Sequence, residues 1–278
     1  MMKNRLFFIG FGNMAEAIHQ RLDKKLFENV FLIEKSDDRR NHINKKNLTN
    51  TQILKQLGET KFSSLDILML AVKPNQIATA CKEIDPLILG KKDIPIIISI
   101  AAGIKISSIR NNFSRFQEEI NIFRAMPNLC AKGGDSVTGL YGEFANDKDS
   151  NSTNVISKIF TSVGKILWVK KESDLHIVTA ISGSGPAYIF YIMQAMIETA
   201  KELGLDEESA KMLVTHTVIG SGKIGVSIDN FAEQISKVTS KGGTTEVAMN
   251  LFKKKNFNLI FKQAIKAAHS KSKEISNS

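Results

Sequence analysis

Two adjacent glycines followed by two threonines give residues 240–245 the clearest chemical meaning in this sequence. Gly242 and Gly243 allow the backbone to pass close to a ligand, because neither carries a side chain. The amide groups that open a following helix bind anions such as a carboxylate, and the hydroxyls of Thr244 and Thr245 add hydrogen-bonding groups there. The simpler alternative is that the threonines only cap this helix. We predict a site for a small carboxylate.

A second glycine-rich turn lies near the N-terminus and has the form G-x-G-x-x-A, from Gly10 to Ala15. It follows an apolar run and opens a predicted helix, which is the context that gives this motif meaning. The first glycine makes the turn, Gly12 admits a pyrophosphate, and Ala15 permits close packing of the helix. The turn therefore predicts a dinucleotide site, although tight strand-to-helix turns also use glycine for geometry alone.

The residues after the second predicted strand concern the choice of nucleotide. Glu34 lies 24 positions after Gly10, where a carboxylate accepts hydrogen bonds from a ribose 2′-hydroxyl and favours NAD. Lys35 and Ser36 at the same turn suit a 2′-phosphate and favour NADP. These residues leave both cofactors open.

The elements that must position these residues fall into two parts. Up to about residue 170, short apolar runs alternate with longer amphipathic segments, which predicts strands joined by crossover helices. The predicted strands are 5–9, 30–34, 67–71, 96–100, 120–125 and 165–169. Their nearly continuous apolar character predicts a parallel sheet covered on both faces. We expect an α/β fold with a Rossmann-like doubly wound domain at 1–170 and an all-helical domain at 171–278.

The helical part begins with a predicted helix at 186–203, which Gly204 ends and which a second helix capped by Asp206 follows. The first helix is apolar around most of its circumference, since Phe190 and Tyr191 fall outside its apolar stripe. Burial by a second subunit explains this composition.

The composition narrows the class of protein. The chain has 278 residues, 42% hydrophobic and 24% charged, with a net charge of +10 and scattered lysine runs that match no nucleic-acid module. Two cysteines without CxxC spacing and five dispersed histidines favour a reducing cytoplasm and no metal site. After the apolar run near the N-terminus, the longest apolar stretch covers residues 94–104 and is too short to span a membrane. We expect a small-molecule substrate, with neither nucleic acid nor a membrane as partner.

Six segments, in order along nearly the whole chain, resemble the pyrroline-5-carboxylate reductase family, whose members complete proline biosynthesis. They are residues 10–15, 71–74 (Ala-Val-Lys-Pro), 99–103, 124–128 (Arg-Ala-Met-Pro-Asn), 182–187 (Ser-Gly-Ser-Gly-Pro-Ala) and 240–245, the last two being specific to that family. The resemblance implies hydride transfer from NADPH or NADH to the C=N bond of 1-pyrroline-5-carboxylate, giving L-proline. It also implies a homodimer through the C-terminal helices, often within a larger ring of dimers, and an active site shared between subunits.

The resemblance also implies individual contacts. Its cofactor contacts fall on Gly10, Gly12, Asn13, Met14, Ala71, Val72, Lys73 and Pro74, with Ala101 and Ala102 near the nicotinamide. Its substrate contacts fall on Gly243, Thr244 and Thr245, to which we add Gly242. We predict that the Thr245 hydroxyl hydrogen-bonds the ring nitrogen and is the catalytic group. No strong acid is required if the imine arrives protonated.

The chain departs from the family pattern at four places. Lys241 replaces a usual proline, Leu129-Cys130 replaces Thr-Pro, and Ser136 replaces a common glycine. The family's NADP users often carry Asn-Arg-Ser or Asn-Arg-Thr where this chain has residues 34–36. The family resemblance thus favours NADPH, whereas Glu34 argues for NADH.

Two other functions remain open. A 3-hydroxy acid dehydrogenase needs a lysine on the helix after a glycine-rich segment, and here no lysine follows Gly185 until Lys201. A protein that binds NAD(P) as a sensor without turnover is the second alternative, which the change at Lys241 keeps open.

Overall fold

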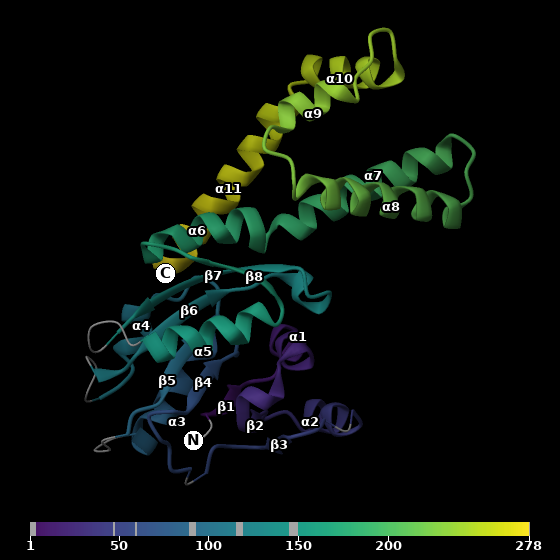
Figure 1. Ribbon diagram of the computed structural model, residues 1–278. Helices are drawn as coiled ribbons and strands as arrows, with labels where there is room; N and C mark the ends of the chain where they lie inside the picture. The colour runs from purple at the N-terminus through teal and green to yellow at the C-terminus, as the bar shows by residue number, and fades with distance from the viewer. Residues whose placement is uncertain are drawn as a thin grey trace. The chain divides into compact units, whose positions relative to one another are not determined.

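The computed structural model describes residues 4–46, 48–58, 60–88, 93–114, 119–144 and 150–277 (Figure 1). The chain divides into two compact units, one made of Met1–Gly183 with Ala268–Ser278 and the other of Ser184–Ala267. We call them the nucleotide unit and the helical unit.

An eight-stranded sheet forms the centre of the nucleotide unit, in the order β3-β2-β1-β4-β5-β6-β7-β8. The strands are β1 (Asn4–Ile9), β2 (Phe27–Ile33), β3 (Thr51–Leu54), β4 (Ile67–Leu70), β5 (Ile96–Ser99), β6 (Ile122–Met126), β7 (Ser136–Glu143) and β8 (Gly164–Trp168). The run from β3 to β6 is parallel, with Phe8 paired to Leu32 on one side and to Met69 on the other. All six predicted strands are present.

The sheet is mixed rather than purely parallel, because β7 runs antiparallel to β6. Only the short helix η4 (Leu129–Lys132) and a few residues join these two strands, and a parallel connection needs a crossover of a dozen or more residues. The expectation of an entirely parallel sheet was therefore wrong at this edge, and β3 and β7 were not predicted.

Helices cover both faces of the sheet, so the doubly wound prediction is confirmed. On one face lie α1 (Asn13–Arg21), α2 (Asp37–Asn44) and α5 (Ser150–Thr161), packed on β-strand residues such as Leu6 and Phe8. On the other face lie α3 (Ile77–Ile88) and α4 (Ile106–Arg110), packed on alternate strand residues such as Phe7 and Ile9. Successive residues of a strand point to opposite faces.

Short helices complete the nucleotide unit. They are η1 (Lys24–Leu26), η2 (Pro74–Gln76), η5 (Glu172–Asp174), α6 (Leu175–Val178) and η6 (Thr179–Gly183), a π-helical turn.

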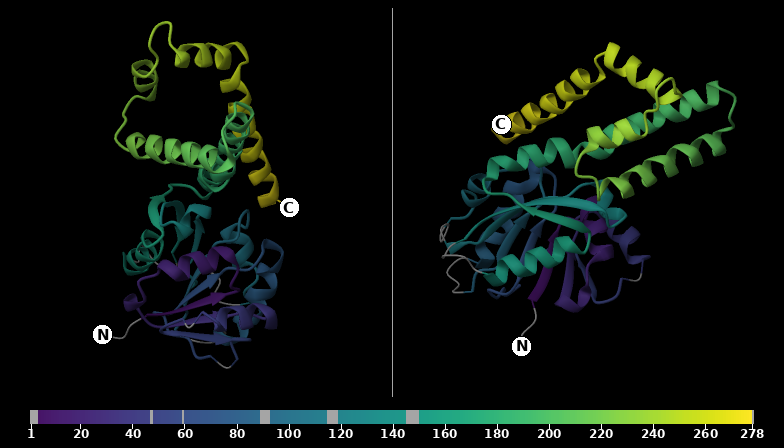
Figure 2. Two further views of the ribbon diagram at one scale, coloured as in Figure 1. Left: turned by 90° about the vertical axis from the view of Figure 1, so that its right-hand side faces the viewer. Right: turned by 45° about the horizontal axis from the view of Figure 1, so that its top comes forward.

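The helical unit contains α7 (Gly185–Glu202), α8 (Glu207–Gly225), α9 (Phe231–Lys237), α10 (Thr244–Lys254) and most of α11 (Phe257–Asn277). Helices α7 and α8 lie side by side (Figure 2). Gly204 has a left-handed φ of +104° just after α7, and the Asp206 carboxylate accepts a hydrogen bond of 2.9 Å from the Ser209 amide to cap α8. Both predicted helix boundaries are confirmed.

Candidate active site

The turn at Gly10–Ala15 joins β1 to α1 and has the geometry that an anion-binding turn requires. Gly10 has a φ of +85°, and a Cβ there would lie 2.6 Å from Val72 Cγ1. Gly12 is the N-cap of α1, no side chain caps the helix, and a Cβ at Gly12 would meet no described heavy atom within 4 Å. The amides of the first turn of α1 therefore face open space, which suits a pyrophosphate.

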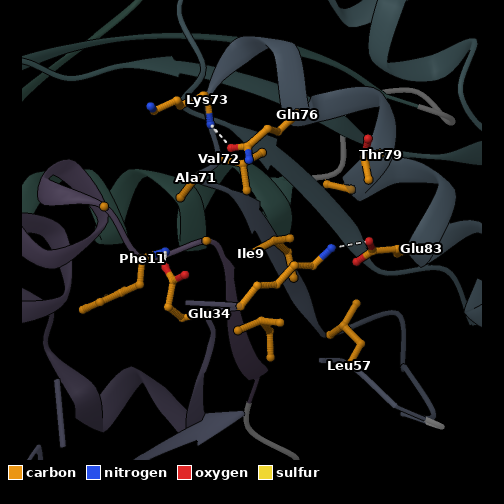
Figure 3. Close-up of a pocket in the computed structure, with 15 residues that line it drawn as sticks. Ile9, Phe11, Glu34, Leu57, Ala71, Val72, Lys73, Gln76, Thr79 and Glu83 are labelled. Carbon is orange, nitrogen blue, oxygen red and sulfur yellow. Dashed lines mark hydrogen bonds and ion pairs between the residues drawn. The ribbon is translucent and has the colours of Figure 1, made fainter. Parts of the chain in front are cut away.

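A cavity of about 330 Å³ opens beside this turn, at the carboxyl ends of β1, β2 and β4 (Figure 3). We call it the Glu34 cavity. Its lining comprises Ile9, Gly10, Phe11, Gly12, Ile33, Glu34, Lys35, Leu57, Ala71, Val72, Lys73, Gln76, Thr79, Ala80 and Glu83. The apolar members suit an adenine base, and ligands of open α/β sheets bind at this edge.

The Glu34 carboxylate is held in place by two backbone amides. Its Oε2 accepts from the Phe11 amide at 3.2 Å and its Oε1 from the Ser36 amide at 2.9 Å. A carboxylate fixed in this way at the end of β2 accepts hydrogen bonds from a ribose hydroxyl and repels a phosphate.

The cations around Glu34 are already paired with acidic groups. Lys35 forms an ion pair with Glu83 of α3 (Figure 3). Arg39 pairs with Glu16 at 2.6 Å, and Arg40 pairs with Asp37. Lys35, Arg39 and Arg40 therefore each have an anionic neighbour.

A second cavity, of about 260 Å³, shares part of its lining with the first. We call it the Ala101 cavity. It is lined by Gly12, Asn13, Met14, Ala15, Ala71, Val72, Lys73, Pro74, Ile100, Ala101 and Ala102. The shared residues, Gly12 and Ala71 to Lys73, make the two cavities adjoining parts of one site.

Residues of other elements support the loop that carries Ala101 and Ala102. Glu172 Oε1 accepts a hydrogen bond of 2.7 Å from the Ile106 amide at the start of α4, and pairs with the buried Arg124 of β6 at 2.9 Å. Gly103 has a φ of +80°, and a Cβ there would lie 2.5 Å from Ile275 Cγ2 in the last turn of α11. Side-chain bonding and close packing thus support the C-terminal half of this loop.

The structure brings together twelve of the thirteen predicted cofactor residues. Ser36 is the exception: it does not line either cavity, and its hydroxyl instead caps α2 by accepting from the Arg39 amide at 3.3 Å. Sequence reasoning missed the contribution of α3 and the turn before it. Gln76, Thr79 and Glu83 follow Pro74 at helical spacing, and that spacing could have revealed them.

Two of the departures from the family pattern meet at Asn128. The Asn128 side-chain oxygen accepts from the Cys130 amide at 2.9 Å, and the Asn128 amide donates to the buried Ser136 hydroxyl at 3.1 Å. The Asn128 side-chain nitrogen donates to the Ser182 hydroxyl at 2.8 Å and to its carbonyl at 3.0 Å. Cys130 and Ser136 therefore take part in fixing Asn128, which in turn holds the π-helical turn η6.

The predicted substrate residues lie together in the helical unit. Residues 240–245, which we call the substrate loop, begin with a turn in which the Gly243 amide donates to the Ser240 carbonyl at 3.0 Å. Gly242 has a φ of +76°, and a Cβ at Gly243 would lie 2.5 Å from Ser240 Oγ. The backbone conformation at Gly242 therefore favours glycine, and a side chain at Gly243 would displace the Ser240 hydroxyl.

Helix α10 starts at Thr244 with Gly243 as its N-cap, and no side chain caps it. Helix geometry leaves the amides of Thr244, Thr245 and Glu246 without an intrahelical acceptor. Glu246 and Lys241 bring charges of opposite sign to the same loop. The arrangement can hold a small carboxylate on two amides, with two hydroxyls beside it.

Within the described residues, no group of three His, Cys, Asp or Glu side chains could hold a metal ion. His176 is buried against Ser272, whose hydroxyl lies 2.9 Å from His176 Nδ1. Burial and the nearby Arg124 lower the pKa of His176, so that this residue favours the neutral form.

Two family models match the chain. Residues 5–103 match "NADP oxidoreductase coenzyme F420-dependent", and residues 172–275 match "Pyrroline-5-carboxylate reductase dimerisation". The first range contains the Gly10 turn and Ala101, and the second contains the substrate loop.

Relatives and solved structures agree with these models. The chain is 30% identical over 279 residues to a pyrroline-5-carboxylate reductase of Pasteurella multocida, covering 99% of this chain and 98% of the relative. It superimposes on a pyrroline-5-carboxylate reductase of Coxiella burnetii with a TM-score of 0.83 and 32% identity, covering 100% of both chains. A Plasmodium falciparum pyrroline carboxylate reductase with NADP bound gives a TM-score of 0.80 at 28% identity, covering 99% of this chain and 98% of that one.

Proposed function

The chain belongs to the pyrroline-5-carboxylate reductase family, and we propose how its own residues bind the two reactants. It is an NAD(P)H-dependent oxidoreductase that reduces the C=N bond of 1-pyrroline-5-carboxylate to give L-proline. The observation that carries the assignment of residues is the presence of two built sites, one in each unit: adjoining cavities at the sheet edge, and an uncapped helix after two glycines.

The cofactor is proposed to lie along the two cavities of the nucleotide unit. Its pyrophosphate would meet the amides of Asn13 and Met14, beside Gly10 and Gly12, and its adenosine would enter the Glu34 cavity. Ala71 to Pro74 and the Ala101–Ala102 pair would border the nicotinamide end. The bound cofactor supplies a hydride, and these residues orient it and keep water away.

The substrate carboxylate is proposed to bind at the substrate loop. The amides of Thr244 and Thr245 would hold it, and Gly242 and Gly243 leave room for its approach. The Thr245 hydroxyl would hydrogen-bond the ring nitrogen and fix the imine carbon for attack. Orientation of this kind accounts for much of the acceleration of a bimolecular step.

We further propose that NADH is the preferred cofactor. Glu34 is fixed by two amides, and Lys35, Arg39 and Arg40 are all paired with carboxylates. A 2′-phosphate would meet the Glu34 carboxylate, while the cations of the same turn and of α2 already have carboxylate partners. A ribose 2′-hydroxyl would instead donate to Glu34.

The helical unit carries the family's dimerisation domain. By length and composition alone, Glu172–Glu202 passes as a membrane-crossing helix, and we propose that a second subunit, rather than lipid, covers it. A ring of dimers in a reducing cytoplasm is the proposed assembly, with residues 1–170 serving the nucleotide and 171–278 the substrate and the dimer. Both cysteines are free thiols.

Steady-state kinetics with pyrroline-5-carboxylate and each reduced cofactor test these assignments. We expect turnover with both and a higher kcat/KM with NADH. Thr245→Ala should lower kcat about tenfold while the dissociation constant for NADH stays within twofold, because it removes one hydrogen bond to the reacting ring. Thr245→Ser keeps the hydroxyl and serves as the matched control. Unaltered kinetics of Thr245→Ala would remove this residue from the site.

The same assay addresses the alternatives. Cofactor binding without oxidation of NADH or NADPH in the presence of the imine would favour a sensor. Oxidation of a 3-hydroxy acid in place of imine reduction would favour the dehydrogenase.

A further inference from the structure

Glu246 folds back from the first turn of α10 onto the substrate loop. Its Oε2 accepts a hydrogen bond of 2.7 Å from the Gly242 amide. Because α10 begins at Thr244, Glu246 is the third residue of the helix, the position from which a glutamate reaches back to cap the preceding backbone. Its carboxylate therefore joins the helix to the residue before the N-cap.

The turn that Glu246 contacts has little restraint of its own. A positive φ at Gly242, together with the bond from the Gly243 amide to the Ser240 carbonyl, defines a type II turn with Lys241 at its second position. Proline favours that position because its ring presets φ, whereas lysine leaves φ free. Lys241 and Gly242 thus leave this turn entropically costly to order.

Different amides at this loop serve different carboxylates. Glu246 takes the Gly242 amide, and the Gly243 amide is used within the turn. The amides of Thr244 and Thr245 stay available for an external anion. The Glu246 carboxylate therefore shapes the loop without occupying the amides to which we assign the substrate.

We propose that Glu246 is a positioning residue: its bond to Gly242 holds the substrate loop in the shape that receives the substrate carboxylate, and it supplies the restraint that Lys241 does not. The proposal rests on the assignment of the substrate carboxylate to this loop. It concerns substrate affinity rather than the reacting atoms, so KM for the imine is the parameter that Glu246 controls.

Two substitutions separate the hydrogen bond from the charge. Glu246→Ala removes the acceptor and should raise KM for pyrroline-5-carboxylate about tenfold, since a hydrogen bond to a charged group is lost. Its kcat and its KM for NADH should change less than twofold. Glu246→Gln keeps an oxygen that accepts from Gly242 and should bring KM back to within about threefold of the parent.

A third substitution tests the link to Lys241. Lys241→Pro presets φ in the same turn, so adding it to Glu246→Ala should recover most of the lost affinity. The control is Glu233→Ala. Glu233 is also the third residue of its helix, α9, but pairs with Lys237 at 2.7 Å, and its loss should leave KM unchanged.

Two results would overturn the proposal. One is an unchanged or lower KM in Glu246→Ala, the lower value meaning that the carboxylate repels the substrate. The other is a raised KM that neither Glu246→Gln nor Lys241→Pro corrects. Gly243→Ala distinguishes this failure from failure of the loop assignment, because its Cβ collides with Ser240. If Gly243→Ala also leaves KM unchanged, the substrate does not bind at this loop.

Discussion

The two units of this chain differ in how far each is complete by itself. The nucleotide unit has buried apolar clusters on both faces of its sheet. In the helical unit, all of whose residues are described, α7 has no buried residue, and Tyr191 and Leu203 are 76% and 82% exposed. The nucleotide unit therefore buries most of its large hydrophobic residues internally, whereas the helical unit leaves many of its own exposed.

Several of the open residues of the helical unit line one groove. Helices α7, α8 and α11 line an apolar groove of about 780 Å³, with Tyr191, Ile192, Met196, Phe257 and Phe261 among its walls. An exposed apolar surface of this kind marks a subunit interface, as the family's dimerisation domain at residues 172–275 indicates. The difference predicts that one chain is sufficient to bind the cofactor, whereas the helical unit needs a second copy to cover its apolar surface.

The largest effect is expected from a charge placed in this groove. Tyr191→Asp would bury an unpaired carboxylate in the dimer, at a cost of about 4 kcal/mol. We expect monomers in sedimentation and an activity about a thousandfold lower, with NADH binding by fluorescence within threefold of the parent. Val226→Asp is the control, because Val226 is 90% exposed and does not line the groove. A dimeric, active Tyr191→Asp protein would contradict the inference that a second subunit covers this groove.

The next effect concerns the stability of the nucleotide unit. His19 is fully buried against Phe8 and Phe11, and burial lowers its pKa from 6.5 to about 4. Its Nε2 lies 3.0 Å from Thr51 Oγ1, and its Nδ1 has no partner among the described residues.

The sign of this effect follows from the lowered pKa. Below pH 6.5 the unfolded chain takes up a proton at His19 while the native chain stays neutral, so stability falls as pH drops from about 6.5 to about 4. The loss reaches about 3 kcal/mol, from 2.5 pH units at 1.36 kcal/mol each. In His19→Phe this part of the pH dependence of urea unfolding should vanish, whereas His42→Gln, at an exposed position, should retain it. An equal slope in His19→Phe and the parent would contradict the assignment.

The same contrast explains what the sequence could predict. β1, β4 and β5 were located within about one residue, because a buried parallel strand is a continuous apolar run. β3 is a short, half-buried edge strand that begins with Thr51 and Gln52, and β7 contains Gly139 and Gly142. A Cβ at Gly139 would lie 2.8 Å from Val178, so packing from a distant helix requires a residue that local propensity places outside strands.

In the candidate site, too, the sequence predicted the features that have a local cause and missed those that depend on distant residues. Glycine turns and strand ends were readable because each has a local geometric cause, and they located the Gly10 turn and the substrate loop. The pairing of Lys35 with Glu83 joins residues 48 positions apart, and no local pattern predicts it. The sequence therefore did not distinguish NADH from NADPH, and the contacts around Glu34 are the basis for proposing NADH.

The smallest predicted effect concerns cofactor preference. It tests whether the nucleotide unit alone determines the choice between NADH and NADPH. Glu34→Ser removes the carboxylate that would face a 2′-phosphate, and should raise the ratio of kcat/KM for NADPH to that for NADH about tenfold. Asp38→Ser is the control, since Asp38 is exposed, does not line the Glu34 cavity and is not one of the carboxylates that pair with Lys35, Arg39 or Arg40. If cofactor choice resides in this unit, the binding ratio should shift by the same factor when Glu34→Ser is combined with the monomeric Tyr191→Asp. A shift that depends on dimerisation would mean that the partner subunit also shapes the cofactor site.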